Sequence, residues 1–205
     1  MTHTGVTVIG SGRAAAAPDV VRIDLAAESG AATVQTALGA ATEGQAAIRT
    51  ALVADGIEGA DLRTTTTSVH VDYSPTGEGP RGYVARLGWS ATVRDVAAAG
   101  GVVARALDAA GEAARLDGMS FSHSDPSALL VVARQVAFAD ARAKAEQFAV
   151  LAGRTLGEVV RVDETLGGGG PIPVFRAQAA FAGDMAVEPG EQEVTATVTV
   201  RWAWA

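Results

Sequence analysis

Apolar and polar residues alternate along several segments of the chain, which is the pattern of half-buried strands. In Val20 to Ala27, in Tyr83 to Val93 and in Val194 to Trp204, the apolar residues fall mainly at every second position. The predicted strands are Val6 to Gly12, Val20 to Ala27, Leu62 to Tyr73, Tyr83 to Val93, Leu116 to His123, Gly157 to Glu164 and Val194 to Trp204. We expect the first two to form a hairpin, and the third and fourth to form another across the Gly- and Pro-rich turn at residues 74–80.

Three further segments carry apolar residues at helical spacing, and we predict helices at Thr33 to Asp55, Val96 to Ala114 and Ser127 to Ala152. Hairpins separated by helices predict an α+β fold with a mainly antiparallel sheet and about three helices packed on one face. No linker divides the chain, so we expect a single domain over residues 1–205.

Residues 165–191 show no periodicity, and a loop of this length in a compact domain is usually functional or disordered. Gly167 to Gly170 lacks the Lys-Ser/Thr pair of a phosphate-binding loop. We expect apolar residues of the loop to pack against a neighbouring subunit, or alternatively to fold back onto the chain's own core. The candidate assembly residues are Phe175, Phe181 and Met185, together with Trp202 and Trp204 of the last strand, for which core packing is the alternative.

Composition excludes several classes of partner and site. The chain has 16 basic and 23 acidic residues, a formal net charge of −7 and a pI of about 4.9. A protein that neutralises phosphates needs a basic surface, so neither nucleic acid nor an anionic membrane is an expected partner. The absence of cysteine excludes disulfides, thiolate nucleophiles and cysteine metal sites.

No apolar run approaches the roughly 20 residues that span a bilayer, so we expect a soluble chain without a transmembrane segment. Residues 1–5 show neither the basic nor the apolar region of a signal peptide. As written, the chain is expected to be cytoplasmic, or exported if a leader has been removed.

The stretch Gly10-Ser11-Gly12-Arg13-Ala14-Ala15 resembles the G-x-G-x-x-A fingerprint of dinucleotide-binding proteins. That fingerprint requires a helix directly after the glycines, because the helix N-terminus holds the pyrophosphate. Pro18 and the next predicted strand leave no room for such a helix. We therefore expect no cofactor, and we predict that Gly10 and Gly12 serve a bend or bulge in a strand.

The stretch SFSHSDP, Ser120 to Pro126, holds the residue types of a hydrolase triad. In a strand, Ser120 and His123 point to opposite faces, whereas a triad needs converging side chains. We predict instead that Ser124 or Asp125 caps the third helix, with Pro126 in its first turn, and we assign no catalytic residue.

His70 and Asp72 lie two apart on one predicted strand, which is a spacing that two metal ligands can have. Further ligands are not evident, because His3 and His123 are the only other histidines. An exposed polar face is the favoured interpretation, and we predict no metal.

The opening stretch VTVIGSGRAAAAPDVVRIDLAAES resembles the start of SIMPL-domain proteins, with its V-x-G-x-G strand followed by A-x-P-D. Four further segments resemble later parts of the family in the same order. They are ALVADGIEGADLRTTTTSV, RGYVARLGWSATVRDV, the block from Leu116 to Glu164, and EPGEQEVTATVTVRWAW. The resemblance implies an α+β fold, self-assembly, frequent export from bacteria, a link to oxidative-stress tolerance and no established enzymatic activity.

These observations predict a non-enzymatic, self-assembling structural or interaction protein that forms a homo-oligomer, with a role in stress tolerance implied by the resemblance alone. The alternative is a small-molecule or peptide-binding module that uses a cleft between the helices and the sheet. A hydrolase using His123 is the third hypothesis.

Overall fold

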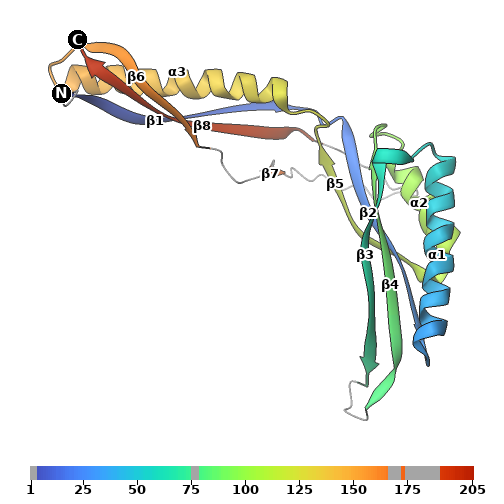
Figure 1. The fold of residues 1–205 in the computed structure, drawn as a ribbon. Helices are drawn as coiled ribbons and strands as arrows, with labels where there is room; N and C mark the ends of the chain where they lie inside the picture. Colours follow the sequence, from blue (N-terminus) through green and yellow to red (C-terminus); the bar gives the residue numbers. More distant parts are fainter. Residues whose placement is uncertain (1–3, 75–78, 166–171, 174–189) are drawn as a thin grey trace. The chain divides into compact units, whose positions relative to one another are not determined.

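The computed structural model of the protein describes residues 4–74, 79–165, 172–173 and 190–205 (Figure 1). These residues form two compact units, each with its own sheet. The terminal unit comprises residues 4–17, 123–165, 172–173 and 190–205, and the central unit comprises residues 18–74 and 79–122. The expected domain over residues 1–205 thus contains two separate cores.

The terminal unit is an antiparallel sheet covered on one face by one long helix. Its strands are β1 (Gly5–Ala16), β8 (Gln192–Trp204) and β6 (Leu156–Thr165), in the order β1–β8–β6, and the short β7 (Ile172–Pro173) also pairs with β8. Helix α3 (Ser127–Leu151) packs mainly on β1 and β8. Every second residue of β8 faces α3, and Val198, Val200 and Trp202 are buried there.

The contact between α3 and β1 is unusually close because both elements present small residues. Alanines recur along the buried side of α3 at every fourth position from Ala133 to Ala149, and each is at most 3% exposed. A Cβ atom at Gly10 would lie 2.7 Å from the Cβ of Ala141 and would collide with the Ala137 carbonyl oxygen. A Cβ atom at Gly12 would collide with the backbone of the same helix. The two glycines therefore let the backbone of α3 approach β1.

This contact explains the dinucleotide-like motif. The bulge that we gave as one possibility at Gly10 and Gly12 is wrong, because the register between β1 and β8 runs without a shift from Gly5 to Ala16. The glycines remove side chains on the helix-facing side of a regular strand, and the sequence does not show which element comes to lie there.

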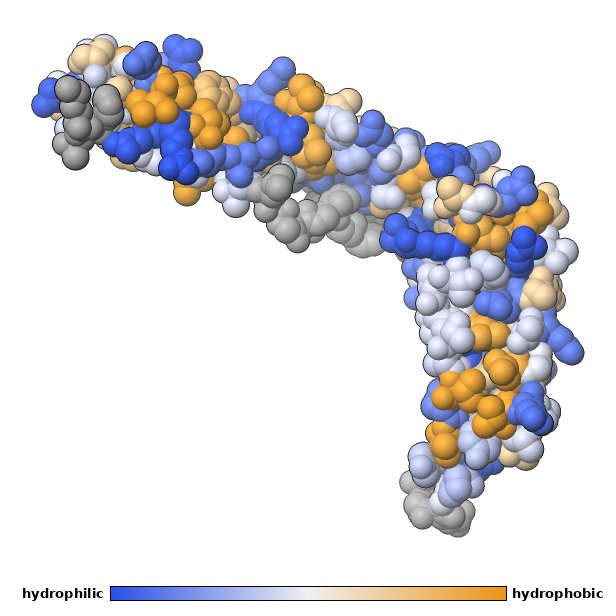
Figure 2. All heavy atoms as spheres, viewed as in Figure 1, coloured by the Kyte–Doolittle hydropathy of each residue, from blue (hydrophilic) through white to orange (hydrophobic). Residues whose placement is uncertain are grey.

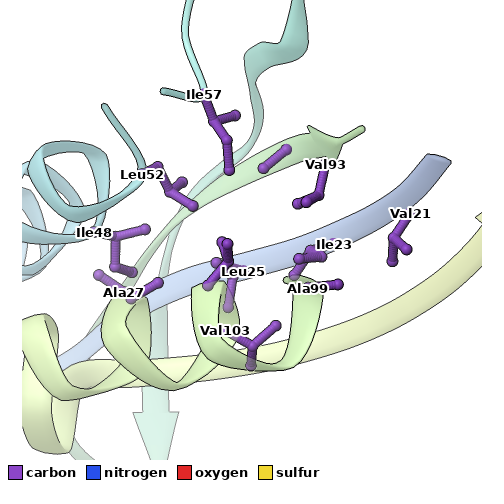
Figure 3. Close-up of a cluster of buried hydrophobic side chains, with 13 residues drawn as sticks. Val21, Ile23, Leu25, Ala27, Ile48, Leu52, Ile57, Val93, Ala99 and Val103 are labelled. Carbon is purple, nitrogen blue, oxygen red and sulfur yellow. The ribbon is translucent and has the colours of Figure 1, made fainter. Parts of the chain in front are cut away.

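The central unit is a four-stranded antiparallel sheet with two helices on one face. Its elements are β2 (Val20–Ala31), α1 (Val34–Ala54), β3 (Leu62–Tyr73), β4 (Pro80–Val93), α2 (Ala99–Ala110) and β5 (Ala114–Ser122), with short 3₁₀ turns at Gly59–Asp61 and Gly111–Ala113. The strand order is β3–β4–β2–β5. Figure 3 shows the buried cluster, in which Leu25 and Ile23 of β2 meet Ile48 and Leu52 of α1 and Val103 of α2.

Most predicted elements, the α+β class and the β3–β4 hairpin are confirmed. The three helices do not share one sheet as expected, because α3 covers the terminal sheet and α1 and α2 cover the central sheet. Two further features differ from expectation. The hairpin of the first two strands is wrong, because β1 pairs with β8 whereas β2 pairs with β4 and β5. The second helix ends at Ala110 rather than at Ala114, because Gly111 takes the left-handed conformation (φ 55°) that stops a helix. None of the helices in the described ranges is long and apolar enough to cross a membrane.

Candidate interaction surface

Large apolar side chains are exposed on α3 and β6 of the terminal unit. Of the fifteen exposed large apolar residues in the described part of the chain, six belong to α3 and three to β6. We call them the α3–β6 apolar surface: Val131, Val132, Val136, Phe148, Val150, Leu151, Val159, Val160 and Val162. In Figure 2, apolar residues are visible at the surface of the part of the molecule that carries these elements.

The cause of this exposure is the alanine side of α3. Because the helix meets the sheet through alanines, its larger apolar residues lie beside or opposite that contact. The helix packs on β1 and β8, and an ion pair links it to β6, with 2.7 Å between Arg134 Nε and Glu164 Oε1. Val162, which pairs with Val200 on the helix-facing side, therefore stays 50% exposed.

The outer edge of β1 is covered by two charged side chains of α3. The Ser11 amide donates to Asp140 Oδ2 at 2.9 Å, and Lys144 Nζ donates to the Ile9 carbonyl at 3.0 Å and to Asp140 Oδ2 at 2.7 Å. The hydrogen bond from Lys144, followed by that from the Ser11 amide, lowers the pKa of Asp140. The carboxylate therefore stays ionised at neutral pH and continues to accept both bonds.

In the central unit, a chain of charges crosses the sheet face opposite α1 and α2. Arg86 of β4 donates to Glu28 of β2 at 2.7 Å and also binds Asp117 of β5, and Arg115 reaches Glu28 at 3.3 Å. The hydrogen bond from Arg86 lowers the pKa of Glu28, and the bonds to Asp117 and Glu28 raise the pKa of Arg86.

Glu28 and Arg86 stay charged and paired near neutral pH, so Glu28 offers no proton for general acid catalysis. The bonds of Arg86 join three strands. Glu28 and Arg86 become neighbours only through the pairing of β2 with β4, so the sequence carries no local signal for the network.

The stretch SFSHSDP is where the third helix begins, as predicted, but the cap is shifted. Helix α3 starts at Ser127 and Pro126 stands just before it, whereas we had placed Pro126 in the first turn. Asp125 Oδ1 accepts a hydrogen bond from the Ser127 amide at 2.9 Å, so Asp125, one of the two predicted caps beside Ser124, binds the helix start. His123 Nε2 is buried without a hydrogen-bond partner among the described residues, so no described hydroxyl or carboxylate holds this nitrogen.

His70 and Asp72 lie on β3, opposite Val84 and Gly82 of β4, and no group of three or more metal-ligating side chains occurs in the ranges that the structure describes. Phe175, Phe181 and Met185 lie outside the described residues.

The two C-terminal tryptophans differ in their surroundings. Trp202 is 2% exposed, with its ring centroid 6.0 Å from that of Phe138, so it packs in the core of the terminal unit. Trp204 pairs with Leu156 of β6 and is half-buried. Trp202 therefore has the core packing that we gave as the alternative to an assembly role for the tryptophans.

A family model described as SIMPL, protein of unknown function (DUF541), matches residues 6–202. The chain belongs to the SIMPL family. Two relatives are each named "26 kDa periplasmic immunogenic protein", one from Brucella melitensis biotype 1 and one from Brucella abortus strain S19. Each is 27% identical over 215 residues, which cover 95% of this chain and 82% of the relative. These names give no support to the cytoplasmic location that we expected for this SIMPL-family chain.

Proposed function

We propose that this member of the SIMPL family is a non-enzymatic protein that assembles with copies of itself through the α3–β6 apolar surface. The observation that carries the proposal is the exposure of large apolar side chains there, including Val150 at 79% and Leu151 at 75%. Single exposed apolar residues are common on monomers, and their concentration on two elements supports an interaction site there. A copy of the same chain is the partner that the family resemblance implies.

The proposal contains no catalytic step. Asp125 is used at the start of α3, and the bonded carboxylates Glu28, Asp61, Asp140 and Asp163 have lowered pKa values because arginine or lysine side chains bind them. Carboxyl groups held in the ionised form cannot serve as proton donors near neutral pH. The hydrolase hypothesis has little support on other grounds, because a triad needs its histidine bonded to a hydroxyl or a carboxylate and His123 Nε2 has no partner among the described residues.

We also propose export to the periplasm, which rests on the names of the two Brucella relatives. A role in oxidative-stress tolerance stays a prediction from the family resemblance. The alternative function, a binding module with a cleft between helices and sheet, has no supporting observation. In the central unit that space is filled by apolar residues that are at most 6% exposed (Figure 3).

Light scattering behind size exclusion, over about a hundredfold range of protein concentration, tests the proposal. We expect a discrete particle whose mass is a multiple of 20.7 kDa. The double variant Val150→Lys/Leu151→Lys places cations in the last turn of α3, where the helix dipole tolerates them, and is expected to reduce the mass.

The matched control is Tyr73→Lys, which replaces a residue that is 67% exposed on β3 of the central unit and should leave the mass unchanged. A wild-type chain that is monomeric at every concentration would contradict self-assembly. A double variant with the wild-type mass would show that Val150 and Leu151, which carry the proposal, lie outside the interface.

A further inference from the structure

We infer that β6 pairs antiparallel with β6 of a second copy, about a two-fold axis that passes at Val162. This inference rests on the proposed self-assembly and specifies where the copies meet. It joins the terminal sheets of the two copies into one continuous sheet whose main strands follow the order β1–β8–β6–β6–β8–β1, with β7 still paired to β8 in each copy.

Among the described residues, β1 and β6 are the outer strands of the terminal sheet, and their edges differ. An outer strand presents unpaired backbone groups, and covering them is one way in which proteins prevent unwanted strand pairing. The edge of β1 is covered by Asp140 and Lys144, which bond to the Ser11 amide and the Ile9 carbonyl. On β6, by contrast, Val159, Val160 and Val162 are 42–50% exposed. Strand addition at β1 would have to displace these two side-chain bonds, whereas at β6 it would cover apolar side chains, so we place the added strand at β6.

Charge complementarity fixes the register. A two-fold axis at Val162 sets Arg161 of each copy opposite Asp163 of the other, which gives two reciprocal ion pairs on the face away from α3. An axis at Arg161 would instead set Glu158 against Glu164, and an axis at Asp163 would leave Arg161 opposite Thr165. Opposite charges directly across antiparallel strands are stabilising and like charges are destabilising, so the register at Val162 is preferred.

The same register also covers the exposed Val162 side chain beside α3. Val162 lies on the face that α3 covers, yet it is half exposed because α3 packs over β1 and β8. A two-fold axis perpendicular to the sheet keeps the α3 helices of both copies on one face. The Val162 side chains then meet each other between the two helices, which removes apolar surface from water.

Cysteine cross-linking provides the first test, because the chain contains no cysteine of its own. Directly opposed residues in antiparallel strands have Cα atoms about 4.5–5.5 Å apart, which is within the range for a disulfide. We expect Val162→Cys to form a disulfide-linked dimer under mild oxidation, at least tenfold faster than the control Ile9→Cys. Ile9 is 60% exposed on β1 of the same sheet.

The second test mixes two charge variants, Arg161→Asp and Asp163→Arg. Each variant alone places like charges across the proposed axis, so each is expected to lose the β6–β6 contact and to show a reduced mass. Mixed together, the two chains carry complementary charges, and the wild-type mass is expected to return. Within one chain, Arg161 Nε and Asp163 Oδ2 lie 2.6 Å apart, and this internal pair is lost in both variants and not regained on mixing. Recovery therefore reports contact between chains.

The outcomes separate this inference from the proposed function. If the wild-type chain is monomeric, self-assembly fails and this inference fails with it. If the wild-type chain is oligomeric but Val162→Cys cross-links no faster than Ile9→Cys, or if mixing restores no mass, the copies meet elsewhere and this inference alone is overturned.

Discussion

Arg86 is the residue at which three strands of the central unit are joined. It binds Glu28 on one neighbouring strand and also binds Asp117 of β5. These charges lie on the face opposite α1 and α2, because side chains alternate along a strand and the neighbouring Ala27 and Leu87 point toward the helices. The Arg86 and Glu28 side chains are 24% and 27% exposed, so water screens the pair less than it screens a fully exposed one.

The Glu28 carboxyl predicts a pH dependence of stability. Its pKa is lowered from the ordinary value of 4.5, so the unfolded chain takes up this proton at higher pH than the folded chain does. The stabilisation is present above pH 4.5 and is lost as the pH falls through the lowered pKa. We expect Glu28→Gln to cost on the order of 1 kcal/mol at neutral pH and progressively less in acid.

Urea unfolding at a series of pH values measures this difference. The control is Glu43→Gln, which replaces an exposed glutamate on α1. A cost for Glu28→Gln that stays constant down to pH 3, or that equals the cost of the control throughout, would contradict the assigned role of the Arg86–Glu28 bond.

At the scale of elements, α3 and β1 are held together by small residues inside and by charged residues at the rim. The alanines of α3 and the two glycines of β1 bring the backbones close. Asp140 and Lys144 then reach the exposed edge of the strand. This arrangement leaves the larger apolar residues of α3 exposed, which is the property that the proposed function uses.

The close approach of α3 to β1 predicts that replacing glycine by alanine changes the free energy of unfolding in opposite directions at two positions. Gly10→Ala is expected to lower the free energy of unfolding by about 1–3 kcal/mol, because the added methyl group collides with α3. Gly39→Ala, at an exposed position in α1 with no atom within 4 Å of the added Cβ, is expected to raise it by up to about 1 kcal/mol. Urea unfolding followed by circular dichroism compares them, and equal effects would show that the contact between α3 and β1 is not tight.

At the scale of the whole molecule, the chain builds two separate cores rather than one. The central core is made by β2, β4, α1 and α2, and the terminal core by β1, β8 and α3. The terminal unit is formed by segments from both ends of the chain, joined by the pairing of β1 with β8.

Because the two units have separate cores, we expect a core substitution to destabilise only the unit that contains it. Leu52 of α1 is fully buried in the central unit, so Leu52→Ala is expected to cost that unit about 2–5 kcal/mol. Hydrogen exchange followed by mass spectrometry should show faster exchange in peptides of β2 and β4 and unchanged exchange in peptides of β1 and β8. Equal acceleration in both groups would show that the two units unfold as one.

The sequence alone determined most of the elements. Alternation located β2, β4 and β8, and helical spacing with flanking glycines located α1 and α3, because these patterns depend on near neighbours in the chain. The same local reasoning placed the start of α3 at Asp125 and Pro126 to within one position.

Only the tertiary structure decided which elements pair and which surfaces remain open. Alternation says which face of a strand is buried but not which strand lies beside it, so the pairing of β1 with β8 was missed. Gly10 and Gly12 acquired their role from α3, about 125 residues further along the chain, and Arg86 acquired its partners from strand register. The α3–β6 apolar surface likewise depends on the tertiary structure, because α3 packs on the sheet through its alanine side and leaves its larger apolar residues exposed.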